Sequence, residues 1–532
     1  MPAITVSHLS WSTPDGRAVL SGLDLQFQPE RTGIVGRNGV GKSTLLRLLT
    51  AELTPTAGHI AIDGSVAMLR QTVQVGADES IADLFEVRAG LALLRKAEAG
   101  EASADEIAEA DWTLEARIDE ALANVGLPVP PETPLTTLSG GQRTRAALAG
   151  AMFAAPDFLL LDEPTNNLDR EGREAVRDLL AGWRGGAIVV SHDRELLEEM
   201  DAIVELTMLG AARYGGGWSA YRARKEIEAA AAEAELAGAE KRADAVQRQA
   251  QAATERQDRR DSGGRRKAAR GDMPRILIGA QKRRAEETRA AGSRLADRQR
   301  GAADEQLSAA RAKIEIVDPL SIGLPSTGLP SSRTVLSLDH VTAGYAPGHP
   351  IIRDVSLAVT GPERVAITGP NGSGKSTLLA LIAGTLTPWE GAVRVPVPFA
   401  LFDQRVSLLD PALSIAGNFL RLNPGTSNNQ CRAALARFRF RAGAADRIVG
   451  ALSGGQMLRA GLACVLGAPT PPQLLILDEP GNHLDIDSLT AVETGLAAYD
   501  GALLVVSHDS AFLDAIGIAR TIELTRIAND EV

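Results

Sequence analysis

Both ends of the chain show short, mostly apolar runs separated by glycine-rich turns and amphipathic segments. Such runs are typical of strands that are buried on both faces of a sheet. They predict strands at residues 32–35, 158–161, 187–190, 364–367, 474–477 and 503–506. Segments 45–49 and 378–382 follow glycine-rich turns and are predicted to be helices. Strands that alternate with helices predict an α/β fold with mainly parallel sheets in each half.

The middle of the chain has a different character. Residues 222–260 and 281–313 are rich in Ala, Glu, Arg, Lys and Gln and contain no proline, which predicts two long helices. Ser-Gly-Gly at 262–264 and Gly-Asp-Met-Pro at 271–274 are expected to interrupt them, so the chain should turn back as an antiparallel hairpin. The predicted domains are 1–221, a helical hairpin linker at 222–317 with its tip near 261–276, an extended Pro/Gly-rich tether at 318–332, and 333–532.

The two halves are copies in a common register. Lys42 and Lys375 lie 333 positions apart, and so do Gln71 and Gln404. Between this glutamine and the next shared motif the first half is longer by 19 residues, because the spacing is 68 in the first half and 49 in the second. The extra segment is expected to be helical and to lie within 85–112. Duplication of a whole motif set predicts two nucleotide sites that act as a pair within one monomer.

Each half carries a glycine-rich phosphate loop, at 36–44 and 369–377. Glycines let successive backbone N–H groups turn toward phosphates at the positive end of the following helix. Lys42 and Lys375 are expected to reach the β and γ phosphates of ATP. The predicted nucleotide-binding residues of the loops are Gly36, Asn38, Gly39, Gly41, Lys42, Ser43 and Thr44, with Gly369, Asn371, Gly372, Gly374, Lys375, Ser376 and Thr377 in the second half.

Acidic residues and a histidine end the predicted core strands. Oxygen ligands suit Mg²⁺, which predicts an ion held by Ser43 and Asp162 in the first half and by Ser376 and Asp478 in the second. One phosphate loop or one Ser-His-Asp run is more often structural than catalytic, but the same set occurs twice in the same order, which favours an ATPase. The predicted catalytic residues are Glu163 and Glu479 to polarise water, His192 and His508 to hold the γ phosphate, and Gln71 and Gln404 to contact Mg²⁺ or water.

Composition restricts the partners. Apolar runs are far shorter than the ~18–20 residues that cross a bilayer, and the N-terminus lacks a secretory pattern, so we expect a cytoplasmic protein without direct membrane insertion. Cys431 and Cys464 have no ligand spacing and are expected to be buried.

Residues 241–300 carry 18 basic and 8 acidic residues, a net charge of +10, whereas the rest of the chain has 38 basic and 59 acidic residues, a net charge of −21. This polarity favours nucleic-acid contact by the hairpin.

The run Leu-Ser-Gly-Gly-Gln at 138–142 and 452–456 resembles the signature of ATP-binding cassette proteins. In that family the signature of one cassette caps the nucleotide of the other. The resemblance implies that Ser139 and Gly141 complete the site of Lys375, that Ser453 and Gly455 complete the site of Lys42, and that ATP closes the two halves together. It also implies that Tyr345 stacks on adenine. In the first half the matching position is Thr13, with Trp11 two positions away, and the choice between them stays open.

Residues 163–169 and 479–485 resemble the Glu-Pro-Thr-Asn-His-Leu-Asp motif of the F subfamily, from which they depart at Asn167 and Gly481. Residues 214–221 resemble that subfamily's exit from its first cassette. The resemblance implies two P-loop ABC ATPase domains joined by a helical hairpin linker, in a protein that binds the ribosomal exit site in the ATP-bound state. It also implies that the linker, which contacts rRNA, reaches towards the peptidyl-transfer centre and the P-site tRNA. The residues at the tip that favour RNA contact are Arg259, Arg260, Arg265, Arg266, Lys267, Arg270 and Arg275.

Two functions within the family remain open, antibiotic resistance by ribosome protection and translation regulation. The short insertion and the short segment after His508 favour the resistance type. The alternative outside this branch is an ATP-hydrolysing subunit that energises a separate membrane transporter, which would make no use of a basic hairpin.

Overall fold

The computed structural model describes residues 1–69, 78–166, 168–268, 298, 300–302, 304–308, 323–482 and 484–526. The chain separates into two compact units. One contains Met1–Tyr221, the first lobe, together with Leu320–Val532, the second lobe; the other is Arg222–Pro319.

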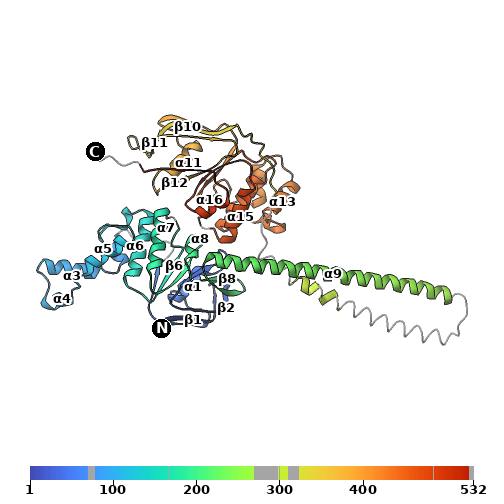
Figure 1. The fold of residues 1–532 in the computed structure, drawn as a ribbon, viewed down its shortest axis with the longest axis horizontal. Coiled ribbons are helices and arrows are strands. Elements are labelled where there is room, and N and C mark those ends of the chain that lie inside the picture. Colours follow the sequence, from blue (N-terminus) through green and yellow to red (C-terminus); the bar gives the residue numbers. More distant parts are fainter. Residues whose placement is uncertain are drawn as a thin grey trace. The chain divides into compact units, whose positions relative to one another are not determined.

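A six-stranded sheet forms the core of the first lobe (Figure 1). Its strand order is β5-β6-β7-β3-β8-β9, in which all neighbours are parallel except the β8–β9 pair. β6 and β7 are buried along their whole length, as continuous apolar runs predict. The strands are β3 (Arg31–Val35), β5 (Val66–Leu69), β6 (Phe158–Asp162), β7 (Gly186–Val190), β8 (Ala202–Thr207) and β9 (Gly210–Gly215), and the associated helices are α1 (Lys42–Leu49), α6 (Gly140–Phe153), α7 (Arg170–Gly182) and α8 (Arg194–Glu198).

The second lobe repeats this arrangement. Its five-stranded sheet is parallel throughout, in the order β14-β15-β16-β12-β17. Each strand has its counterpart in the first lobe, which confirms the predicted repeat of two α/β domains with mainly parallel sheets. The strands are β12 (Arg364–Thr368), β14 (Phe399–Phe402), β15 (Leu474–Asp478), β16 (Ala502–Val506) and β17 (Arg520–Glu523), and the helices are α11 (Lys375–Ile382), α14 (Gly454–Leu466), α15 (Ile486–Ala497) and α16 (Ser510–Ala515).

Each lobe also has a three-stranded antiparallel sheet that the sequence pattern did not predict. The orders are β2-β1-β4 and β11-β10-β13. The register shifts within β1 and β10, where His8 and His340 adopt positive φ, and these bulges break the alternation of buried and exposed positions. The strands are β1 (Ala3–Ser12), β2 (Ala18–Phe27), β4 (Ala57–Asp63), β10 (Thr334–Ala343), β11 (Ile352–Thr360) and β13 (Glu390–Arg394).

A helical region lies between the glutamine and signature motifs of each lobe. In the first lobe it packs around a separate apolar cluster that includes Ile81, Leu91 and Ile118. The insertion expected within 85–112 holds α3 and α4, which confirms its helical character. The helices are α2 (Ile81–Leu84), α3 (Arg88–Glu98), α4 (Ala104–Glu109) and α5 (Leu114–Asn124), with α12 (Ile415–Leu422) and α13 (Asn428–Arg437) in the second lobe. Cys431 in α13 and Cys464 in α14 are both buried, as predicted.

The helix α9 (Trp218–Ala268) corrects one prediction. It continues through residues 262–264, where Ser-Gly-Gly was expected to interrupt it. A glycine inside a helix costs only about 1 kcal/mol relative to alanine, and the surrounding Ala, Arg, Gln and Lys are strong helix formers, so the helix persists. The predicted turn at 271–274 and the tip residues from 269 onward lie outside the described residues. The described positions from 298 to 308 are helical.

Residues 323–330 have no regular secondary structure, and the first part of the expected tether, through 322, is outside the described residues. Within the part of the chain that the structure describes, no helix combines the length and the apolar character that crossing a bilayer requires.

Candidate active site

The first phosphate loop joins β3 to α1. Gly36, Gly39 and Gly41 all have positive φ, between 83° and 149°. At Gly36 a Cβ atom would lie 2.3 Å from the carbonyl oxygen of Leu206 in β8, so only glycine fits this close approach. Gly369 is in the same position in the second lobe, where a Cβ atom would lie 2.2 Å from the carbonyl oxygen of Leu524. Both loops therefore have the left-handed turns that direct backbone N–H groups inward.

The two loop lysines are buried and fold back over their own loops. Nζ of Lys42 donates to the carbonyl oxygen of Gly36 at 2.5 Å. Nζ of Lys375 donates to the carbonyl oxygens of Gly369 at 2.7 Å and Pro370 at 3.1 Å. Burial lowers the pKa of both ammonium groups, and neighbouring carboxylates oppose that shift. The structure thus places each cation at the mouth of the predicted phosphate site.

Asp162 and Asp478 end the central strands β6 and β15. Burial raises the pKa of both carboxyl groups, and a hydrogen bond from Ser43 partly opposes the shift at Asp162. Oδ1 of Asp162 is buried without a hydrogen-bond partner, which is the state of an oxygen placed to ligate a cation. Ser43 and Asp162 therefore fit the predicted Mg²⁺. Among the described residues no group of three or more His, Cys, Asp or Glu side chains is arranged to hold a metal ion.

Each predicted catalytic glutamate contacts the predicted histidine of its lobe. Nε2 of His192 lies 3.2 Å from Oε1 of Glu163, and Nε2 of His508 lies 3.6 Å from Oε1 of Glu479. Burial raises the pKa of Glu163 to about 8 and lowers the pKa of His192 to about 3. The lowered pKa keeps the imidazole of His192 neutral, so its contact with Glu163 is not an ion pair.

The second pair has a milder environment. Burial raises the pKa of Glu479 to about 7, a shift that the guanidinium of Arg173 from the first lobe opposes. Burial lowers the pKa of His508 to about 4, and the charges of Lys375 and Arg173 lower it further. The largest charge that opposes burial is thus Arg173 of the other lobe at Glu479, and Lys42 of its own lobe at Glu163.

The same two glutamates have an unusual backbone conformation. Glu163 and Glu479 have φ of 52° and 48°, a region that non-glycine residues rarely occupy. Their N–H groups donate to the carbonyl oxygens of Val190 and Val506, each at 2.9 Å, which ties them to the ends of the neighbouring strands. Strain of this kind gathers at functional positions. Sequence alone gives no sign of it.

A cavity of about 530 Å³ opens beside the first phosphate loop. Both adenine candidates of the first half, Trp11 and Thr13, line it. Every described residue that lines the cavity belongs to the first lobe, so the structure does not bring Ser453 and Gly455 into it. The predicted site residues that line it are Asn38, Gly39, Gly41, Lys42, Ser43, Thr44, Asp162, Glu163 and His192.

The signature residues begin helices. Ser139 and Ser453 are the N-caps of α6 and α14, and each accepts a hydrogen bond from the N–H group of the glutamine three residues later. Of the remaining predicted residues, Tyr345 is 66% exposed and Gln404 is exposed just beyond β14. Gln71 lies outside the described residues, as do Asn167 and His483.

Two aspartates that we had not predicted as site residues connect the lobes. Oδ2 of Asp485 accepts from the N–H group of Asn38 at 2.8 Å, and Oδ2 of Asp169 accepts from the N–H group of Asn371 at 3.0 Å. Burial acts to raise the pKa of both carboxyl groups, but hydrogen bonds, including these from backbone N–H groups, more than offset it and keep the pKa low. Each phosphate loop is therefore held by a carboxylate of the other lobe. Asp169 and Asp485 are the last residues of the two motifs that resemble the F subfamily, and this position was the sequence feature that could have identified them as site residues.

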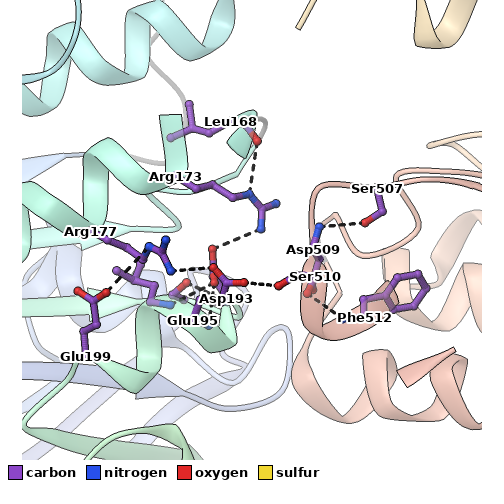
Figure 2. Close-up of polar contacts among 12 residues, drawn as sticks. Leu168, Arg173, Arg177, Asp193, Glu195, Glu199, Ser507, Asp509, Ser510 and Phe512 are labelled. Carbon is purple, nitrogen blue, oxygen red and sulfur yellow. Dashed lines mark hydrogen bonds and ion pairs between the residues drawn. The ribbon is translucent and has the colours of Figure 1, made fainter. Parts of the chain in front are cut away.

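Figure 2 shows the polar network beside this contact. Nη1 of Arg173 lies 3.3 Å from Oδ2 of Asp193, and its Nε donates to the carbonyl oxygen of Leu168 at 3.4 Å. Oγ of Ser510 in the second lobe donates to Glu195 in the first. A cavity of about 30 Å³ lies here, and residues from both predicted catalytic sets line it, His192 from one and Glu479 from the other.

Comparisons with known proteins agree with this geometry. The ABC transporter family matches residues 20–166 and 352–482. The tylosin resistance ATP-binding protein TlrC of Streptomyces fradiae is 34% identical, over 93% of this chain and 92% of that protein. The energy-dependent translational throttle protein EttA of Mycobacterium tuberculosis is 30% identical, over 94% and 87%. The ATP-binding cassette sub-family F member 3 of Rattus norvegicus is 31% identical, over 93% and 68%.

These matches confirm the two predicted ABC ATPase domains and the predicted resemblance to ATP-binding cassette proteins of the F subfamily. The chain is an ATPase that belongs to the F subfamily of ATP-binding cassette proteins.

Proposed function

We propose that this ATPase binds the ribosome in its ATP-bound state and acts through the linker, 222–317, near the peptidyl-transfer centre. The relatives named for tylosin resistance and for a translational throttle cover more than nine tenths of the chain. The observation that carries the proposal is the charge distribution, a net of +10 in residues 241–300 within a chain that is otherwise acidic. A basic helical segment next to an acidic body favours rRNA, and possible contact with P-site tRNA, over an acidic protein partner.

The residues that recur in both lobes each have a role in the proposed ATP hydrolysis. Lys42 and Lys375 bind the β and γ phosphates, and the backbone N–H groups of the glycine loops bind the phosphate oxygens. Mg²⁺, held by Ser43 with Asp162 and by Ser376 with Asp478, neutralises the charge on the phosphate oxygens when bound.

Glu163 and Glu479 accept the proton of the attacking water, and His192 and His508 hold the γ phosphate. A base works best when its pKa lies near the working pH, and burial brings both glutamates into that range. Gln71 and Gln404 contact the ion or the water. Ser139 with Gly141, and Ser453 with Gly455, complete the opposite sites after the lobes close further, since the first cavity is lined by first-lobe residues in the described part of the chain.

Co-sedimentation with ribosomes tests the proposal. A Glu163→Gln, Glu479→Gln double variant keeps both phosphate loops but lacks the bases, so we expect it to bind ATP, remain closed and pellet with ribosomes. A Lys42→Ala, Lys375→Ala variant is the matched control and should stay in the supernatant, because it cannot hold the phosphates. Charge reversal at Arg265, Arg266 and Lys267 should reduce pelleting of the trapped variant while basal ATP hydrolysis is retained. A trapped variant that stays in the supernatant with ATP would rule out the proposed partner.

The match to a tylosin resistance protein favours antibiotic resistance over translation regulation within this proposal. We therefore expect expression of the chain in a macrolide-sensitive host to raise the minimal inhibitory concentration of tylosin-like macrolides. The Glu163→Gln, Glu479→Gln variant should not, because it cannot leave the ribosome. Unchanged susceptibility to macrolides, lincosamides and pleuromutilins would favour the regulatory branch. An energising subunit of a transporter, the alternative, would neither pellet with ribosomes nor respond to the charge reversal.

A further inference from the structure

The short helix α8 lies where three parts of the chain meet. It begins directly after His192 and Asp193, so it is attached to the end of β7 that carries the predicted γ-phosphate contact. Its first residues contact the second lobe, and its last residue contacts the first turn of α9.

The contact with the second lobe is a buried bidentate ion pair. Nη1 of Arg194 lies 2.8 Å from Oε1 of Glu493, and Nη2 donates to Oε2 at 3.0 Å. The two side chains are only 9% and 11% exposed. A buried pair in this geometry depends on both partners, because burying a guanidinium without a carboxylate beside it is costly in free energy.

The contact with α9 holds the beginning of that helix. Oε2 of Glu198 accepts from the N–H group of Ser219 at 2.8 Å and from its Oγ at 2.9 Å. The chain before it is pressed against α8, since a Cβ atom at Gly217 would lie 2.2 Å from the carbonyl oxygen of Glu198. The guanidinium of Arg194 lies 5.9 Å from the centre of the Trp218 ring. Arg194 thus contacts Glu493 and the first residue of α9 at the same time.

The repeat does not produce a second copy of this ion pair. The repeat offset of 316 between Asp162 and Asp478 aligns Arg194 with Ser510 and Glu493 with Arg177. Arg177 lies 2.7 Å from Glu195 and 3.9 Å from Glu199 of its own lobe, and Ser510 donates to the same Glu195 (Figure 2). Among the described residues, the positions related by the repeat to Arg194 and Glu493 therefore do not form a buried bidentate pair.

We propose that α8 couples the pairing of the lobes to the linker, with Arg194 as the positioning residue. When the lobes separate, Arg194 loses the carboxylate of Glu493 and cannot remain buried as an unpaired cation. Its guanidinium then leaves the Trp218 ring, α8 shifts, and the support of the first turn of α9 by Glu198 is weakened. Pairing of the lobes reverses these steps. The inference goes beyond the proposed function, because it concerns events within this chain and requires no ribosome.

Amide hydrogen exchange of the full chain, measured without ribosomes, tests the coupling. In the Glu163→Gln, Glu479→Gln background, ATP should slow exchange of the amides of residues 218–225 by about tenfold, because local opening becomes rarer when α8 is fixed. Adding Glu493→Gln, which keeps the shape of the side chain but removes its charge, should abolish most of that slowing. Trp218→Leu, which acts at the other end of the contact, should do the same.

The matched control is Glu363→Gln, which makes the same substitution in an ion pair with Arg520 at 2.9 Å within the second lobe, away from α8, and should leave the ATP-dependent slowing in place. Binding of a fluorescent ATP analogue and exchange within β6 and β7 should be the same in all variants, which separates a lost coupling from a misfolded chain. If ATP still slows exchange at 218–225 in a folded Glu493→Gln variant, or in Trp218→Leu when Glu493→Gln does not fold, the coupling through Arg194 is wrong. Either result leaves co-sedimentation with ribosomes as a separate question.

Discussion

Burial, more than sequence position, determines the state of the first catalytic pair. The motifs identify Glu163 and His192 as site residues, and the structure brings their side chains to 3.2 Å. Their protonation could not be predicted from the motifs, because it depends on how much of the surrounding lobe excludes water from them. Burial shifts both groups toward the neutral form, upward for the glutamate and downward for the histidine.

The pair should have a recognisable effect on stability in protein freed of nucleotide and Mg²⁺. The raised pKa of Glu163 contributes stability that is present below about 4.5 and is lost as pH rises to about 8. The lowered pKa of His192 contributes stability that is present above about 6.5 and is lost as pH falls toward about 3. Between pH 4.5 and 6.5 the two slopes oppose each other, so the pair contributes little net pH dependence.

Substituting one residue of the pair should leave only the pH dependence of stability that the other residue contributes. In Glu163→Gln the Tm should rise with pH from 4.5 to 6.5 relative to wild type, with a limiting slope of about 1.4 kcal/mol per pH unit in the free energy of unfolding. In His192→Asn the Tm should fall with pH over the same range. Scanning fluorimetry at half-unit pH steps in EDTA measures both. Curves for the two variants that run parallel to wild type would mean that the pair does not carry these shifts.

At the scale of elements, continuous apolar strands were predictable and bulged strands were not. All six predicted core strands are present, because each is buried on both faces and needs no alternation. β1 and β10 were missed, since a bulge at His8 or His340 moves the buried face by one residue. The persistence of α9 through Gly263 and Gly264 shows a third case, in which the composition of a long segment outweighs two residues that usually end helices.

The continuity of α9 leads to a simple prediction. If residues 263 and 264 are helical, Gly263→Ala and Gly264→Ala should each stabilise the helix by about 0.8–1 kcal/mol and slow exchange of the amides of residues 258–268 by about fivefold. Ala245→Gly, in the middle of the same helix, is the matched control and should accelerate exchange around it to a similar extent. Faster exchange in the two alanine variants would indicate a turn with positive φ at these positions, as first expected.

At the scale of the whole molecule, the repeat is visible in the sequence but the contacts between its copies are not. Asp485 and Asn38 are 447 positions apart, and Asp169 and Asn371 are 202 apart. These two contacts are equivalent under the sequence repeat, because the aspartate and the asparagine both occur in each lobe. The ion pair of Arg194 with Glu493 does not, since its counterparts are serine and arginine. Register predicts symmetric contacts, whereas the asymmetric one requires knowing which side chains face each other.

Because α9 is long, a change in orientation at its first turn would move its far end by a large distance. A straight helix of 51 residues is about 76 Å long at 1.5 Å per residue. If the proposed coupling tilts the helix by about 5° at Trp218, its far end would be displaced by about 7 Å. A small rearrangement at α8 would then be amplified along the length of α9.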